Sequence, residues 1–146
     1  DMSFAALTSG ICLANAGLGA VHGLAGIIGG MFDIPHGVAC GTLMAKANEV
    51  NIRELRKQKR DHPALARYAT LGEMFLREKG KSADWYIDGF ADHLRSLSAE
   101  LGMPALGKYG IRKDDLRVIC RQTDIKNNPV ALSEDDLYEI LHSRLD

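Results

Sequence analysis

A chain of 146 residues is long enough to bury one hydrophobic core, and its 46% hydrophobic and 25% charged content is that of a soluble globular protein. A formal net charge of −1 gives no electrostatic basis for binding nucleic acid, so we expect no nucleic-acid partner. The most basic stretch also contains acidic residues and is expected to be a solvated helix face; it holds Arg53, Arg56, Lys57, Lys59 and Arg60.

Apolar spacing at the N-terminus predicts two short helices. Phe4, Leu7 and Ile11 recur at helical spacing on one face of the first helix, which the glycines at positions 17 and 19 are expected to end or bend. A second helix is expected over residues 21–28, stopped by the glycine pair at 29–30.

Further helices are predicted along the rest of the chain. Residues 32–35 form a turn, and a long helix runs from about residue 37 into the basic stretch. Pro63 suits the first turn of the next helix. The helix after Ser82 carries an apolar stripe at three- and four-residue spacing, formed by Ile87, Phe90, Leu94, Leu97 and Leu101.

The C-terminal part adds two shorter helices, over about residues 113–123 and after Pro129, where Ser133 and Asp136 fit a capping box. No segment shows convincing strand alternation. The predicted fold class is therefore all-α, with six or seven helices in a single domain over residues 1–146. Because the chain begins within a predicted helix and shows no targeting segment, we expect it to be part of a longer protein.

The first 45 residues contain no lysine or arginine and could be mistaken for a membrane segment. Polar residues such as His22 and His36 interrupt this stretch, and its glycines and alanines are only weakly hydrophobic, so we expect buried core and no membrane partner.

The three cysteines are far apart and lack CxxC spacing, which favours a reducing cytoplasm. Each is expected to be a small buried apolar residue; they are Cys12, Cys40 and Cys120.

His22 and His36 are the candidate site residues. An imidazole in an apolar segment needs a partner, either a metal or a hydrogen-bond acceptor. On one continuous helix the two would lie about 21 Å apart along the axis, whereas imidazoles sharing a metal bind it at about 2.0–2.1 Å each. The chain must therefore fold back, which the glycine pair at 29–30 and Pro35 permit. The spacing allows a shared metal, but by itself it is met more often by ordinary core or turn histidines.

A catalytic metal site usually needs three or more protein ligands, and the remaining candidates are poorly placed. Asp33 is expected to cap a helix, and His62 and His142 have no companion at ligand spacing. The acidic row beside His93 lies opposite the apolar stripe and is expected to be solvated; it comprises Asp84, Asp88 and Asp92. Cys12, Cys40 and His22 form no recognisable nucleophile arrangement, and no phosphate-binding glycine loop is present.

Four segments of this N-terminal region resemble the signature of the iron-containing, or group III metal-dependent, alcohol dehydrogenases. They are Asn15-Ala-Gly-Leu-Gly19, Val21-His22-Gly-Leu-Ala25, Gly29-Gly30 and Phe32-Asp-Ile-Pro-His36-Gly-Val-Ala39. The resemblance is most specific over residues 2–51. It continues more loosely to Asn128-Pro129 and the final helix.

The resemblance implies that the chain is the C-terminal helical domain of such an enzyme, similar to that of dehydroquinate synthase, without the N-terminal α/β domain that binds NAD or NADP. It implies Fe²⁺ or Zn²⁺ held by an aspartate and three histidines, with His22 and His36 at two of the histidine positions. The other two ligands belong to an Asp-x-x-x-His pattern expected upstream of residue 1. The implied reaction is metal-assisted hydride transfer between a small alcohol and its aldehyde or ketone, in a homo-oligomer.

Many family members carry a further histidine four residues after the first metal histidine, and here that position is Gly26. Glycine cannot transfer a proton, so we predict no catalytic residue in this chain and leave the substrate alcohol open. The chain alone is expected to be inactive. Two alternatives stay open: a non-catalytic helical interaction module, and a related enzyme such as a glycerol dehydrogenase or a sugar-phosphate cyclase.

Overall fold

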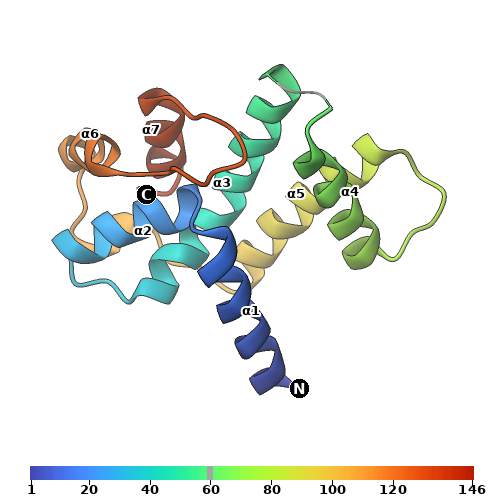
Figure 1. The fold of residues 1–146 in the computed structure, drawn as a ribbon. Helices are drawn as coiled ribbons and strands as arrows, with labels where there is room; N and C mark the ends of the chain where they lie inside the picture. The colour runs from blue at the N-terminus through green and yellow to red at the C-terminus, as the bar shows by residue number, and fades with distance from the viewer. Residues whose placement is uncertain (59–60) are drawn as a thin grey trace.

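A computed structural model of the chain describes residues 1–58 and 61–146. In this part of the chain, seven α-helices and one short 3₁₀ helix are joined by loops without any strand, which confirms the predicted all-α fold class (Figure 1). Their bounds are α1 Met2–Ala16, α2 Ala20–Met31, α3 His36–Gln58, α4 Pro63–Leu76, α5 Ala83–Glu100, η1 Leu106–Tyr109, α6 Lys113–Gln122 and α7 Glu134–His142. Lys59 and Arg60 of the predicted basic face lie outside the described residues.

The long helix α3 contributes to both hydrophobic clusters of the molecule. Figure 1 shows α6 and α7 on one side of α3 and α4 and α5 on the other. The first cluster joins α2, α3, α6 and α7, and its fully buried members include Leu24, Leu43, Leu116 and Ile140. The second joins α3, α4 and α5 through Ile52, Leu55, Leu65 and Ile87. Burial of this apolar area is the main stabilising contribution to the fold.

Helices α4 and α5 form a tightly packed hairpin. A Cβ atom added to Gly72 would overlap the backbone of Tyr86, so glycine is what permits this approach. Ser82 caps α5 by accepting a 3.2 Å hydrogen bond from the Trp85 N–H. The predicted apolar stripe of α5 is buried at Ile87, Phe90 and Leu94 but exposed at Leu97 and Leu101, near the end of the helix.

The side chains of residues 2–15 of α1 are exposed, contrary to the prediction of a buried segment. Phe4, Leu7 and Ile11 are 74%, 62% and 55% exposed, and Figure 1 shows the helix projecting from the other helices. The apolar spacing was a correct guide to helix formation but not to what covers the helix. Gly17, with a φ of 73°, ends α1 as predicted. In α2 the prediction of burial is confirmed at Ala20, Leu24, Ala25 and Ile28.

The described residues contain no single helix that is both long and apolar enough to cross a membrane. Helices α1 and α2 meet those two conditions only when they are taken together, and they are bent by 93° relative to each other. The expected absence of a membrane partner stays a prediction.

Candidate metal centre

A reversal of the chain between α2 and α3 brings the two candidate histidines together. Helix α2 continues through Gly29 and Gly30, so the prediction that this pair stops the helix and forms the bend is wrong. Neither glycine has a positive φ, because the helical hydrogen bonds persist as far as the Phe32 N–H, which donates to the Ile28 carbonyl at 2.9 Å. The reversal begins at Phe32, which is extended, and ends at Pro35.

His22 and His36 face each other across this reversal. His22 lies in the first turn of α2 and His36 is the first residue of α3. Their Nδ1 and Nε2 atoms are 3.2 Å apart, and the two rings lie with centroids 5.4 Å apart and planes within 19° of parallel. Their predicted approach is therefore present in the structure. Their role as metal ligands stays a prediction.

The chemistry and spacing of the two imidazoles fit a divalent ion. Two nitrogens that bind one tetrahedral ion at about 2.0–2.1 Å each are about 3.3 Å apart, and the observed separation is 3.2 Å. His22 is half-buried and His36 is exposed, so the pair opens to the surface. An ion held there would be accessible to a small molecule from outside.

Cys40 is the third donor at this site, and sequence reasoning missed it. Its Sγ lies 3.4 Å from His22 Nδ1 and 3.4 Å from His36 Nε2. The available signal was the four-residue spacing from His36 at the start of a predicted helix, which places both side chains on one face. Burial raises the pKa of the Cys40 thiol.

The three cysteines differ from their common prediction. Cys120 is buried, as predicted, and burial raises the pKa of its thiol to about 11. Cys12 is exposed because α1 projects from the fold, and Cys40 is only half-buried beside the histidines. The prediction of three buried apolar cysteines therefore holds at one position.

Gly26 leaves open space on the same face of α2 as His22. It lies one helical turn after His22, it is exposed, and a Cβ atom added to it would have no atom within 4 Å. The structure thus places no side chain where many family members are expected to carry a histidine.

The other predicted non-ligands lie elsewhere. Asp33 is exposed in the turn. His62 accepts a 3.2 Å hydrogen bond at Nδ1 from the Ala64 N–H and so caps α4. The ring of His93 packs on Phe75, and that of His142 packs on Tyr138.

Asn128 fixes the start of the helix that carries His22. Its Oδ1 accepts a 3.1 Å hydrogen bond from the Ala20 N–H, in place of a capping side chain at Gly19. Its Nδ2 donates to Asn51 Oδ1 at 2.7 Å and to the Val130 carbonyl at 2.8 Å. This one amide therefore connects α2, α3 and the loop before α7. In the sequence, the only indication that Asn128 matters was that Asn128-Pro129 belongs to the part of the chain that resembles the family more loosely.

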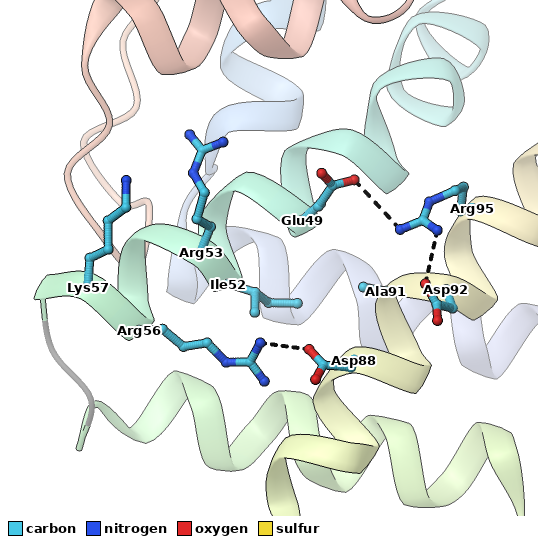
Figure 2. Close-up of a pocket in the computed structure, with 9 residues that line it drawn as sticks. All are labelled: Glu49, Ile52, Arg53, Arg56, Lys57, Asp88, Ala91, Asp92 and Arg95. Carbon is cyan, nitrogen blue, oxygen red and sulfur yellow. Dashed lines mark hydrogen bonds and ion pairs between the residues drawn. The ribbon is translucent and has the colours of Figure 1, made fainter.

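A second concave surface, between α3 and α5, is a salt-bridged groove without a histidine or a cysteine (Figure 2). Figure 2 shows Arg56 pointing toward Asp88, to which it donates a 2.6 Å hydrogen bond, while Arg53 points to another side of α3. Lys57 pairs with Glu54 at 2.8 Å. The three described residues of the predicted basic face are thus engaged by carboxylates, and not simply solvated.

Paired charges also characterise the acidic row of α5. Asp84, Asp88 and Asp92 are exposed, as predicted, but Arg56 holds the first two and Arg95 lies 3.0 Å from the third. Since each cation of the groove already has an acidic partner, the groove offers no free charge to an anionic ligand. The histidine site is the better candidate for chemistry.

Comparison with known proteins decides the family. Residues 1–145 match the model described as "Fe-containing alcohol dehydrogenase family, C-terminal". The chain belongs to the iron-containing alcohol dehydrogenase family. The predicted resemblance is thereby confirmed over almost the whole chain.

Several members of the family are similar along most of the chain. Lactaldehyde reductase of Escherichia coli K12 is 26% identical over 148 residues, covering 98% of this chain and 37% of the reductase. The bifunctional aldehyde-alcohol dehydrogenase of the same strain is 33% identical over 119 residues, covering 76% of this chain and 13% of that enzyme. The crystal structure of a 1,3-propanediol oxidoreductase matches with a TM-score of 0.82 and 26% identity, covering 99% of this chain and 37% of the other. This chain therefore spans little more than a third of the length of the reductase and of the oxidoreductase, and a smaller share of the bifunctional enzyme.

Proposed function

We propose that this chain is the metal-binding part of an NAD(P)-dependent alcohol dehydrogenase that interconverts a small alcohol with its aldehyde or ketone. The observation that supports this proposal most directly is the 3.2 Å approach of His22 Nδ1 and His36 Nε2 in a chain of this family. Relatives named lactaldehyde reductase and 1,3-propanediol dehydrogenase, the latter from Citrobacter freundii, favour a small oxygenated substrate.

In this proposal His22 and His36 hold Fe²⁺ or Zn²⁺ through the two ring nitrogens that face each other. The ion, when bound, supplies Lewis-acid polarisation of the alcohol or carbonyl oxygen. Both imidazoles must be neutral to bind it, so the affinity should fall as the pH is lowered. The exposed edge at His36 leaves a side of the site open to substrate and cofactor.

Hydride transfer also requires NAD(P), which carries the redox chemistry. This chain has no strand among its described residues and no dinucleotide-binding motif. We therefore assign NAD(P) binding to the part of the relatives that this chain does not match, and we expect no turnover from the 146 residues alone. A homo-oligomer in the cytoplasm is part of the same proposal, and the free cysteines fit a reducing compartment.

Metal titration tests the proposal on the 146-residue chain itself. The wild-type chain should bind about one Zn²⁺ or Fe²⁺. His22→Ala and His36→Ala should each lower the metal affinity by about tenfold or more, because losing only a hydrogen-bond partner of a ligand already lowers it by about tenfold. His142→Ala is the matched control, because this exposed histidine lies at the end of α7. Equal binding by all four proteins would overturn the proposed site.

Activity tests the second part of the proposal. Alcohol oxidation should appear when the chain is joined to an NAD(P)-binding domain of the family, and it should be lost in the His22→Ala variant. Turnover by the 146 residues alone, with Fe²⁺ and NAD(P)⁺ supplied, would contradict the assignment of NAD(P) binding to a separate domain.

A further inference from the structure

We propose that Cys40 is a third protein ligand of the ion held by His22 and His36, and that the resulting set of two imidazoles and one thiolate favours Zn²⁺ over Fe²⁺. This inference rests on the proposed metal site and goes beyond it, because neither the sequence pattern nor the family signature assigned a role to Cys40.

The three donor atoms form an almost equilateral triangle. Its sides are 3.2 Å between the two ring nitrogens and 3.4 Å from Sγ to each of them. Around a tetrahedral Zn²⁺ with bonds of about 2.0–2.1 Å to nitrogen and 2.3 Å to sulfur, nitrogen and sulfur donors lie about 3.5 Å apart. The triangle therefore needs almost no rearrangement to accept an ion on one side.

The backbone aims Cys40 at the site. Cys40 follows His36 by four residues within α3, so the two side chains share one face of that helix, and α2 supplies the third donor. A cysteine that serves only as a small apolar residue looks different in this molecule. Cys120 is 4% exposed and is a buried member of the first hydrophobic cluster, whereas Cys40 is half-buried at the edge of that cluster and has two ring nitrogens as polar neighbours.

Ligand chemistry then selects the ion. When Cys40 binds, the S–H bond breaks, the proton leaves to solvent, and the thiolate donates an electron pair to the metal. Sulfur is a soft donor, so replacing a harder ligand by thiolate shifts preference toward Zn²⁺. The two ligands expected upstream of residue 1 lie outside these 146 residues, so within this chain the two imidazoles and the thiolate are the donors that set the preference.

The absorption spectrum of bound Co²⁺ shows directly whether a sulfur atom is among its ligands. The test uses Co²⁺ added to the 146-residue chain in a Cys12→Ser background, which removes the exposed thiol of α1. A near-ultraviolet thiolate-to-Co²⁺ charge-transfer band should appear on titration. It should vanish in the further Cys40→Ser variant, while the visible bands of imidazole-bound Co²⁺ persist more weakly.

The possible results separate this inference from the proposed function. Co²⁺ binding with the visible bands but no charge-transfer band in the parent protein would overturn ligation by Cys40 and leave the histidine site standing. No Co²⁺ binding at all, in a chain whose circular dichroism is helical, would overturn both. A charge-transfer band that survives in Cys40→Ser would overturn ligation by Cys40.

X-ray absorption on the Zn²⁺-loaded chain gives a measurement that needs no variant. One sulfur scatterer at about 2.3 Å is expected beside the nitrogen shell, and a shell of nitrogen and oxygen alone would contradict the inference. In competition between Fe²⁺ and Zn²⁺ under anaerobic conditions, Cys40→Ser should reduce the preference for Zn²⁺ by about tenfold or more. An unchanged preference would count against the selective role of the thiolate.

Discussion

Asn128 accepts a hydrogen bond from the backbone N–H of Ala20 at 3.1 Å, although 108 residues separate them in the sequence. Helix α2 begins at Ala20 and carries His22 in its first turn. The loop before α7 therefore sets the position of a candidate metal ligand that it does not touch. The N-terminal signature of this chain depends on a contact from near its C-terminus.

Replacing Asn128 with alanine should lower both stability and metal affinity. The change removes one acceptor and two donors, and we expect the free energy of unfolding to fall by about 1–3 kcal/mol. Denaturant unfolding and Zn²⁺ titration measure the two effects. Asn127→Ala, at the exposed neighbouring position, is the control and should change either quantity little. A Zn²⁺ affinity untouched in folded Asn128→Ala would show that the amide does not position His22.

Two glycine-to-alanine changes should act in opposite directions. Gly26 has open space around a new Cβ atom and lies within α2, so Gly26→Ala should stabilise the protein by about 0.5–1 kcal/mol through helix propensity. In Gly72→Ala the new methyl group would overlap the Tyr86 backbone, and the cost of separating α4 from α5 should be about 1–3 kcal/mol. Thermal unfolding of both variants tests the prediction, and equal effects of the two changes would refute it.

The stability of the protein should decrease in acid through Glu54. Hydrogen bonds from Lys57 and Arg53 lower the pKa of this carboxyl from 4.5 to about 2. Because the folded pKa lies below the unfolded one, the stabilising contribution is complete above about pH 4.5 and is lost as the pH falls toward about 2.

Glu54→Gln should therefore show a smaller loss of unfolding free energy over that interval than the wild type, as measured by urea unfolding at a series of pH values. Glu100→Gln, at an exposed position at the end of α5, is the control and should follow the wild-type curve. Parallel curves for wild type and Glu54→Gln would remove the basis of the prediction.

Arg53 links α3 to α7 in a way that lysine cannot reproduce. Its guanidinium donates to Glu54, Asp136 and Glu139 at 2.7–2.9 Å. A lysine keeps the charge but lacks the planar fork that serves several carboxylates at once, so Arg53→Lys should cost about 1–2 kcal/mol. In the control Arg95→Lys, an exposed pair with Asp92 is changed, and the effect should stay below about 0.5 kcal/mol. Similar losses in both variants would argue against the geometric explanation.

Much of the helical layout could be predicted from local patterns. The capping box of Ser133 and Asp136 and the proline at the start of α4 mark helix ends through interactions within one turn, and both are present in the structure. The exposure of α1 could not be predicted, because helical spacing of Phe4, Leu7 and Ile11 shows which face is apolar but not what covers it. Gly29 and Gly30 were misleading for a related reason: glycine permits a bend without requiring one, and the hydrogen bonds of α2 continue through the pair.

The residues of the candidate site were also only partly predictable from the sequence. Family-like spacing identified His22 and His36, and the need for a reversal between them followed from helix geometry. Cys40 was overlooked because a single cysteine has no paired-ligand motif, and its significance depends on a second helix lying alongside. Asn128 was beyond local reasoning altogether, since its partners Ala20 and Asn51 are distant in the chain.

The two histidines and Cys40 all lie within a short stretch, in which the outermost donors are 18 positions apart in the sequence. Closing so short a loop costs little chain entropy, and that cost grows only slowly with length. A cross-link over so short a loop removes little entropy from the unfolded chain, so an ion bound there would stabilise the contact between α2 and α3 mainly by binding the folded state alone. Heating should then separate α2 from α3 later than it releases the unclamped hairpin of α4 and α5.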